Sequence, residues 1–259
     1  IYRQAESSHI VLNAHKINAG ELITLDNKNK DFFFFEKKDV RSVMGALVYL
    51  VKTRLPEYIG ASPFEIQVLT PMRKGLLGVE RLNTILQMYL NPPDKRKREK
   101  EFRGVIFREG DKVMQVKNNY QLEWEVRTKY GLSIDKGTGI FNGDTGIIEE
   151  INDFAETMTI SFDEGKMVEY SYKNLEELEH AYAVTIHKSQ GSEYPAVVIP
   201  LLTGPQMLLN RNLLYTAVTR AKKCVTIVGN DETFNMMIQN NIEAKRYTGL
   251  KARLQEGII

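Results

Sequence analysis

Cysteine is almost absent from this sequence of 259 residues, because Cys224 is the only one. A single thiol excludes a framework of internal disulfides, and such sparing use of cysteine is typical of proteins from a reducing cytosol. Cys224 has neither a neighbouring histidine nor a second cysteine. We therefore interpret it as a structural residue and expect no metal site.

Long apolar runs are missing as well. No stretch approaches the ~20 consecutive apolar residues that span a membrane. The chain does not open with a basic segment followed by an apolar one, as a signal peptide would. We therefore expect a cytoplasmic protein without a membrane partner. The first residue is Ile1 rather than methionine, and we interpret the chain as part of a longer polypeptide.

The sequence also lacks G-x-x-x-x-G-K-[ST], the loop that cradles nucleotide phosphates. This excludes a complete ATP site of that type within these residues. The pair Gly165-Lys166 is followed by Met167 and falls in a predicted hairpin turn. The pair Asp231-Glu232 resembles a magnesium-binding pair, but we interpret Asp231 as the N-cap of the last helix.

A large excess of one charge is lacking too, since the net charge is only +2. The charges are nevertheless unevenly distributed. Residues 91–178 hold 14 Lys and Arg against 18 Asp and Glu, whereas the rest of the chain holds 21 against 15. A polyanion would therefore meet the flanks of the sequence rather than its middle.

Strands alternate with helices in the first hundred residues, which predicts an α/β fold with a parallel sheet and helices on both faces. We expect Ser7 or Ser8 and Asp39 to begin helices and Gly20 to end the first one. The four phenylalanines at 32–35 are interpreted as part of a buried strand rather than as a base-stacking platform. The predicted helices lie within 7–20, 39–55 and 77–90, and the predicted strands within 31–35 and 65–71.

Short strands and tight turns replace this pattern in the middle of the chain. About five strands between residues 102 and 172, with turn pairs at 109–110, 142–143 and 164–165, predict a small β-barrel. A charged, proline-led linker precedes it, and we prefer a core position for Trp124 over an exposed one. The expected organisation is one α/β domain, residues 1–93 and 179–259, interrupted by a barrel at 94–178.

Two polar segments in the last third of the chain carry the candidate chemistry. The first, AYAVTIHKSQGSEYPAVVIP at 181–200, crowds polar residues around Gly191 between two apolar strands. We expect it at the carboxyl end of the sheet, where α/β proteins bind ligands, with Gly191 letting backbone N–H groups approach an anion. The second, LLYTAVTRAKKCVTIVG at 213–229, places Arg220 between a predicted helix and a predicted strand.

Four segments together resemble the motifs of superfamily-one helicases. Residues 184–199 resemble motif V, 213–229 resemble motif VI, 2–20 resemble motif IV, and 68–83 resemble the segment between motifs IV and V. The form HKSQGSE is closer to the 5′-to-3′ RecD-like branch than to the UvrD-like branch, and an inserted SH3-like barrel also resembles RecD-like helicases. The chain therefore resembles a second RecA-like motor domain with an SH3-like insertion.

This resemblance implies that ATP and Mg²⁺ are bound mainly by the N-terminal RecA-like domain of the same polypeptide. The present chain would supply Arg3 and Arg220 to the γ-phosphate, a task that suits a permanently charged, bidentate guanidinium. Glu193 and Gly191 would lie beside the nucleotide. We expect the chain alone to have no ATPase or helicase activity.

The resemblance also implies backbone contacts with single-stranded DNA, which position a strand without reading its sequence. The residues expected to make these contacts are Thr70, Arg73, Thr185, His187, Lys188, Ser189, Asn13 and His15.

Simpler interpretations compete with these assignments. Arg220 could only favour a helix dipole, and His187 could be a structural histidine, but the motifs around them favour functional roles. A different class of function is a non-catalytic module whose barrel docks a nuclease or repair protein. The helicase part of a conjugative relaxase shares these motifs and is a third alternative.

Overall fold

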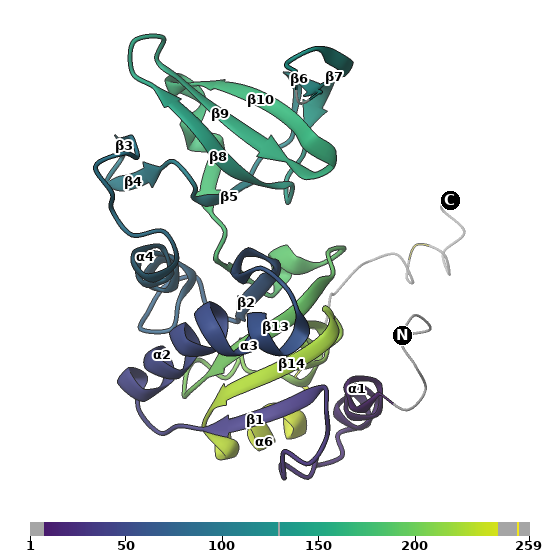
Figure 1. Ribbon diagram of the computed structural model, residues 1–259. Coiled ribbons are helices and arrows are strands. Elements are labelled where there is room, and N and C mark those ends of the chain that lie inside the picture. The colour runs from purple at the N-terminus through teal and green to yellow at the C-terminus, as the bar shows by residue number, and fades with distance from the viewer. Residues whose placement is uncertain (1–7, 129, 243–252, 254–259) are drawn as a thin grey trace.

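The computed structural model describes residues 8–128, 130–242 and 253. It contains an α/β unit and an antiparallel β unit that is inserted into the chain of the first (Figure 1). The chain leaves the α/β unit after α4 (Val79–Leu90) and returns to it at β12 (Ala183–Thr185). Arg3, one of the predicted ATP contacts, lies outside the described residues.

A five-stranded sheet forms the centre of the α/β unit, and all of its paired strands run parallel. Its inner strands are buried along most of their length, as expected where helices cover both faces of a parallel sheet. The predicted parallel sheet is therefore confirmed. In spatial order the strands are β1 (Phe32–Glu36), β14 (Ala221–Gly229), β13 (Tyr194–Leu201), β2 (Ile66–Thr70) and β12.

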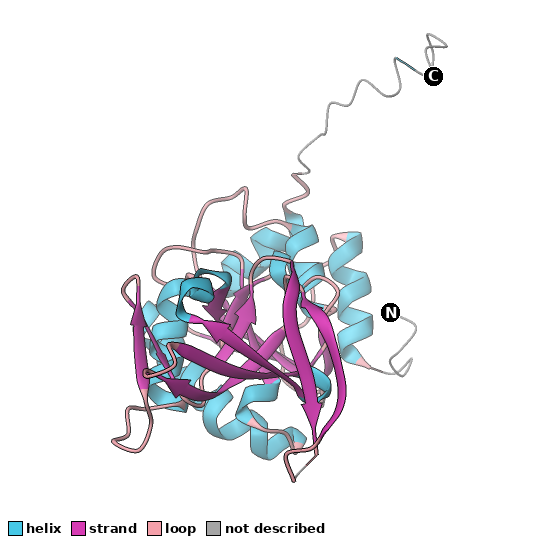
Figure 2. Ribbon diagram, turned by 90° about the horizontal axis from the view of Figure 1, so that it is seen from above, coloured by secondary structure: helices cyan, strands magenta, loops and turns pink. Residues whose placement is uncertain are grey.

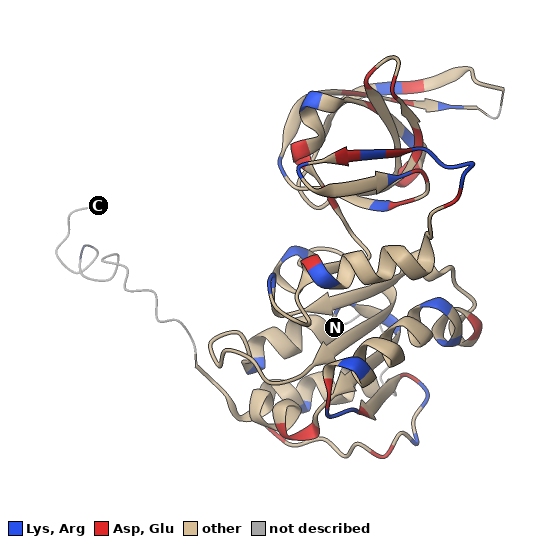
Figure 3. Ribbon diagram, turned by 90° about the vertical axis from the view of Figure 1, so that its left-hand side faces the viewer, with Lys and Arg blue, Asp and Glu red and all other residues tan. Residues whose placement is uncertain are grey.

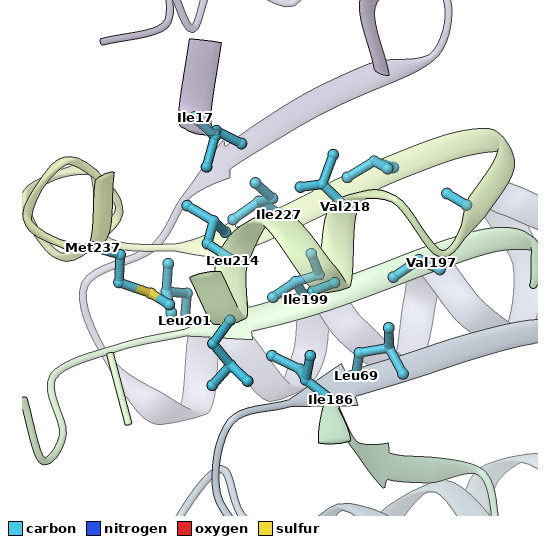
Figure 4. Close-up of a cluster of buried hydrophobic side chains, with 14 of the residues drawn as sticks. Ile17, Leu69, Ile186, Val197, Ile199, Leu201, Leu214, Val218, Ile227 and Met237 are labelled. Atoms are coloured by element: carbon cyan, nitrogen blue, oxygen red, sulfur yellow. The ribbon is translucent and has the colours of Figure 1, made fainter. Parts of the chain in front are cut away.

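Helices pack on both faces of this sheet (Figure 2). Figure 4 shows Ile17, Leu214 and Met237 from one helical layer gathered near Ile199 and Ile227 of the sheet. Fully burying one such side chain contributes about 1.5–3 kcal/mol. That layer consists of α1 (His9–Ala19), α5 (Arg211–Val218) and α6 (Asp231–Gln239), and the opposite layer of α2 (Val40–Tyr49), a π-helical turn (Leu50–Arg54), α3 (Leu55–Ile59) and α4.

The helix ends follow local capping signals. The Asp39 carboxylate accepts a hydrogen bond from the Ser42 N–H at 2.9 Å, and Gly20 ends α1 in the left-handed conformation. The prediction for the last helix was wrong by one residue. Asn230, not Asp231, is its N-cap, because the Asn230 side chain accepts from the Thr233 N–H at 2.8 Å. Asp231 lies in the first turn, where its charge still favours the helix dipole.

Seven antiparallel strands form the sheet of the inserted unit, which is more than the five or so expected. Figure 3 shows this sheet curling into a barrel. The predicted turn pairs at 109–110, 142–143 and 164–165 are confirmed, since each connects successive strands. In spatial order the strands are β11 (Leu178–His180), β5 (Lys112–Gln115), β8 (Thr145–Asn152), β9 (Thr157–Phe162), β10 (Lys166–Ser171), β6 (Asn119–Arg127) and β7 (Ser133–Ile140).

The ends of the inserted unit differ from the expected ones in two respects. Because β11 pairs with β5, the barrel sheet extends to His180, beyond the expected boundary after residue 178. The charged stretch before the barrel is not a linker throughout, since β3 (Glu99–Phe102) forms a hairpin with β4 (Val105–Arg108). Alternate residues of β3 are exposed and charged, so the strand carries no apolar pattern that would predict it.

The aromatic residues are mostly structural, as predicted. Phe32 and Phe34 are buried in the α/β core, whereas Phe35 at the end of the strand is 40% exposed. Trp124 packs, partly buried, at the margin of the barrel core. The Lys166 ammonium lies 5.1 Å from the centre of its ring, a distance at which a cation is attracted to an aromatic face.

A buried carboxylate joins the two units at the start of β5. Asp111 accepts hydrogen bonds from Asn91 Nδ2 at 2.7 Å, the Tyr182 hydroxyl at 2.9 Å and Gln87 Nε2 at 2.6 Å. His180 Nε2 lies 3.0 Å from the same carboxylate. Burial raises the pKa of Asp111, but these hydrogen bonds and the His180 ring outweigh it and hold that pKa below its ordinary value.

The neighbouring Lys112, on β5 of the barrel, extends its side chain across the same junction into the α/β unit. Its buried ammonium donates to the Phe64 carbonyl at 2.7 Å and to Gln67 Oε1 at 2.9 Å, both in the α/β unit. Burial lowers the pKa of Lys112 to about 8, although the carboxylates of Asp163 and Glu65 oppose this shift. Two adjacent residues of opposite charge therefore anchor the barrel to the α/β unit.

Candidate functional site

The polar segment of residues 186–193 runs from the carboxyl ends of the parallel strands, here called the carboxyl edge of the sheet, back to their amino ends, here called the amino edge. Thr185 pairs with Thr70 at the carboxyl ends of β12 and β2, whereas Ala196 pairs with Ile66 at the amino ends of β13 and β2. The segment between the two parallel strands must therefore return to the opposite edge. We expected the whole segment at the carboxyl end. Only its first part lies there, while Gly191 and the residues after it approach the amino end.

Arg220 lies at the amino edge, between the end of α5 and the start of β14. Its guanidinium donates to the Ser192 carbonyl at 3.2 Å and to the Thr216 carbonyl at 3.3 Å. The Arg220 carbonyl in turn accepts from the Tyr194 N–H at 2.9 Å. These acceptors are uncharged, so they orient the half-buried guanidinium without neutralising its charge.

Glu193 and Gly191 lie on the same side of the sheet as Arg220. Glu193 is exposed, and its carboxylate lies 3.4 Å from the Lys222 ammonium. Gly191 has a φ of +90°, which strongly favours glycine, and a Cβ there would meet open space. The requirement for glycine at 191 is therefore conformational rather than a matter of close packing.

A cleft of about 600 Å³ separates this edge from the barrel. Glu193, Asp144, Asp163 and Glu65 all line it, and Lys112 is the single cation among its lining residues. Four carboxylates make this cleft unfavourable for a polyphosphate. The cleft beside the barrel is therefore not a candidate polyphosphate site.

The carboxyl edge carries a cluster of charged side chains, which we call the Glu179 cluster: Arg73, Lys188 and Glu179. Arg73 Nη2 lies 2.6 Å from Glu179 Oε1 and Arg73 Nη1 lies 3.4 Å from Oε2, while the Lys188 ammonium lies 3.1 Å from Oε2. Glu80 approaches Arg73 at 3.7 Å from the other side. Burial raises the pKa of Glu179, but the two cations outweigh it and hold that pKa below its ordinary value.

Two predicted DNA contacts use their hydroxyl groups inside the protein instead. Thr70 is fully buried and donates to the Leu77 carbonyl at 2.7 Å. Ser189 is also fully buried and donates to the Ile186 carbonyl at 2.7 Å. Neither hydroxyl can reach a phosphate in this arrangement, so both residues are structural supports of the turns that follow β2 and β12.

The remaining predicted DNA contacts divide into two groups. Thr185 and His187 lie next to Lys188, where Thr185 is half-buried and accepts from the Lys188 N–H at 3.3 Å, and His187 is exposed. Asn13 and His15 are both on α1, which packs against α5 and β14. Asn13 is buried and His15 is exposed. The structure thus joins the first pair, but not the second, to the Glu179 cluster.

Sequence reasoning missed Glu179 and Lys222, which pair with predicted site residues. Glu179 was assigned to the start of the second α/β segment, whereas it belongs to β11 of the barrel sheet. A three-residue strand carries too short an alternation of exposed and buried positions to be recognised in the sequence. Only the pairing of β11 with β5 shows that Glu179 lies beside Arg73 and Lys188.

Residues 8–128 and 130–242 contain no group of three or more His, Cys, Asp or Glu side chains arranged to hold a metal ion. Cys224 is buried, and burial raises the pKa of its thiol to about 11, which agrees with a structural role. Within the same described ranges, no helix has the length and apolar character needed to cross a membrane.

Comparisons with known proteins agree with the two-unit organisation. The family model described as the SH3 domain of ATP-dependent RecD-like DNA helicases matches residues 82–162. The model described as the UvrD-like helicase C-terminal domain matches residues 180–228. The first match falls largely on the inserted unit, and the second runs from the end of β11 almost to the end of β14.

Individual relatives cover the chain more completely. The ATP-dependent RecD2 DNA helicase of Deinococcus radiodurans is 32% identical over 255 residues, which are 98% of this chain and 31% of that protein. The RecBCD enzyme subunit RecD of Mycolicibacterium smegmatis is 37% identical over 121 residues, which are 47% of this chain and 21% of that protein. The chain therefore spans less than a third of the length of either relative.

A solved structure shares the fold. The Pif1 helicase from Bacteroides, in complex with ADP-AlF3 and single-stranded DNA, superimposes with a TM-score of 0.51. The superposition covers 99% of this chain and 56% of the Pif1 chain, at 18% sequence identity. The α/β unit with its inserted barrel is thus an arrangement found in a known helicase structure.

Proposed function

Because this chain belongs to the RecD-like superfamily-one helicases, we propose that it is the second motor domain of an ATP-dependent, 5′-to-3′ DNA helicase or translocase. Its partners would be single-stranded DNA and a RecA-like domain N-terminal to it in the same polypeptide. That domain would make most of the contacts to ATP and Mg²⁺, since these 259 residues lack a phosphate-binding loop. The chain alone would then be inactive.

The observation that carries this proposal is the position of Arg220. Its guanidinium lies at the amino edge of the sheet and is oriented by the uncharged carbonyls of Thr216 and Ser192. Bound ATP would supply the γ-phosphoryl group, and Arg220 would stabilise the negative charge that develops on its oxygens. Arg3 is proposed as a second such arginine, and Gly191 and Glu193 as contacts on the nucleotide side.

The opposite edge is proposed to hold the DNA backbone. Arg73, Thr185, His187 and Lys188 lie around the carboxyl ends of β2 and β12, where ammonium, guanidinium and hydroxyl groups can meet phosphates. Residues 186–193 connect this edge with the Arg220 edge. A change at the nucleotide would therefore reach the DNA contacts through a single covalent segment.

Substitution of Arg220 tests the proposal in the full polypeptide that contains both motor domains. We expect Arg220→Ala to leave ATP binding nearly intact and to reduce DNA-stimulated ATP hydrolysis by about 10³-fold or more. The reason is that the guanidinium acts on the charge of the transition state rather than on the bound substrate. A fluorescent ATP analogue measures binding, and phosphate release measures hydrolysis.

Lys223→Ala is the matched control, because Lys223 is an exposed cation three residues further along the same segment. It should change hydrolysis by less than about twofold, as expected for surface substitutions away from a site. Unchanged turnover in Arg220→Ala would show that the arginine is not a catalytic contact.

A further inference from the structure

The Glu179 cluster contains one carboxylate shared by two cations from different parts of the chain. Arg73 follows β2 and Lys188 follows β12, so both belong to the α/β unit, whereas Glu179 is on β11 of the barrel sheet. The two nitrogens of the Arg73 guanidinium face the two oxygens of Glu179, and Lys188 approaches one of these oxygens. The barrel thus inserts an anion between two cations of the motor domain.

This geometry is the one by which a phosphate would be bound. Guanidinium groups bind carboxylate and phosphate in the same bidentate manner, and an ammonium adds a point charge to either. A carboxylate and a backbone phosphate diester each carry one negative charge. The two anions cannot occupy the position between Arg73 and Lys188 together, because like charges in direct contact repel strongly.

The cluster is open to solvent, so an exchange of anions is sterically possible. The side chains of Arg73, Lys188 and Glu179 are 51%, 28% and 32% exposed. Ion pairs at such exposure contribute little to the stability of a fold. The contact is therefore weak enough to be replaced by a ligand and is not needed to hold the barrel, which Asp111 and Lys112 anchor.

We propose that Glu179 is an internal competitor of DNA, whose carboxylate occupies the position of a backbone phosphate and must leave it when single-stranded DNA binds. This inference rests on the proposed function, because it assumes that Arg73 and Lys188 contact DNA. It adds a regulatory element: the inserted barrel lowers the DNA affinity of the motor domain through one side chain. Glu80, which approaches Arg73 at 3.7 Å, would assist only weakly.

Glu179→Gln tests the competitor directly, because it removes the charge and keeps the shape. Binding of a fluorescein-labelled oligothymidylate to the 259-residue chain is measured by anisotropy across a salt series. We expect Glu179→Gln to bind about tenfold more tightly at low salt, since two cations are freed for phosphates. The advantage should shrink as the salt concentration rises, because salt screens exposed charges.

Glu176→Gln is a matched control for the change in net charge. Glu176 also holds two cations, with Lys117 and Arg103 each at 3.1 Å, but it lies in the turn before β11 and not in the cluster. It should alter the affinity by less than about twofold. An equal gain in both glutamine variants would show a general charge effect and would overturn the proposal.

The Arg73→Gln, Lys188→Gln double variant separates the inference from the function on which it rests. We expect it to bind DNA more weakly, and we expect Glu179→Gln to give no gain when added to it. If the double variant weakens binding but Glu179→Gln alone does not tighten it, the competitor is overturned and the DNA contacts stand. If neither change alters the affinity, or if no variant binds at low salt, both are overturned.

Discussion

Asp111 is a residue at which polar side chains of both units meet. Asn91, Gln87 and Tyr182 donate to it, and His180 lies against it, so one carboxylate satisfies side chains from both units. Because the site is fully buried, water cannot replace a lost acceptor. The cost of changing this residue should therefore be the cost of several unsatisfied donors rather than of one hydrogen bond.

Asp111→Asn is expected to lower the free energy of unfolding by about 3 kcal/mol. The new amide presents its own N–H groups to Asn91, Gln87 or Tyr182, which are themselves donors toward this position. Urea denaturation of the 259-residue chain measures the change. Asp153→Asn is the control, because Asp153 accepts from a tyrosine hydroxyl but is 67% exposed, and it should cost less than about 1 kcal/mol. Equal effects would refute the buried network as a source of stability.

The sequence indicates candidate site residues more readily than it indicates what their side chains touch. The motifs selected Arg73, Lys188 and Arg220 by residue type and spacing, and the structure places the first two in one cluster. Their shared partner Glu179 is 106 residues from Arg73, and no local pattern encodes a pairing over that separation. Thr70 was misjudged for a related reason: a hydroxyl at a strand end can bond its own turn as readily as a ligand.

Among the secondary-structure elements, β14 passes close to the backbone of β13 at Gly229. A Cβ on Gly229 would lie 1.7 Å from the Leu201 carbonyl oxygen, and the Lys37 N–H donates to the Gly229 carbonyl at 2.7 Å from the other side. Because backbone atoms lie on both sides of Gly229, β14 cannot shift to make room for a Cβ. Gly229 is therefore required by the spacing of the strands.

Gly229→Ala should lower the free energy of unfolding by about 3 kcal/mol or more, because the clash involves backbone rather than a movable side chain. Gly45→Ala is the opposite case, since Gly45 lies in α2 and a Cβ there meets nothing within 4 Å. That change should raise stability by about 0.5–1 kcal/mol. Thermal unfolding followed by circular dichroism measures both, and a tolerated Gly229→Ala would contradict the close approach.

Elements with a repeating pattern or a capping residue were predictable, and short or charged ones were not. Asp39 and Gly20 mark helix ends because their local conformations need those residue types. In contrast, β3 and β11 have three or four residues and are held by their partner strands. The course of residues 186–193 follows from the parallel sheet that the sequence already predicts, because a connection between two parallel strands must return to their amino ends, so this error was avoidable.

At the scale of the whole molecule, the contact between the two units gives the free energy of unfolding an unusual dependence on pH. Lys112 of the barrel is buried against the α/β unit, and its pKa is lowered to about 8 from 10.5. In the unfolded chain the ammonium keeps its proton up to about pH 10.4, so between pH 8 and pH 10 the unfolded state binds more protons. The contribution of Lys112 to the free energy of unfolding therefore rises between pH 8 and pH 10, by on the order of 2 kcal/mol.

Lys112→Met should remove this rise, whatever its effect on absolute stability. Guanidinium denaturation of the chain at pH 8, 9 and 10 gives the slope. Lys28→Met is the control, because the Lys28 side chain is 84% exposed, and it should keep the slope of the unmodified chain. Identical slopes in all three proteins would mean that Lys112 is not held in a low-dielectric position.

The interrupted order of the sheet has a consequence for how the chain acquires its structure. Within the part of the chain that the structure describes, β1 pairs with β14 alone and β2 pairs only with β13 and β12, so these two strands, made before the barrel, do not pair with each other. The barrel is continuous in sequence and can form its sheet from local pairings. During synthesis the inserted unit would therefore fold before the domain that surrounds it. The strands β1 and β2 would remain unpaired until β12, β13 and β14 have been synthesised.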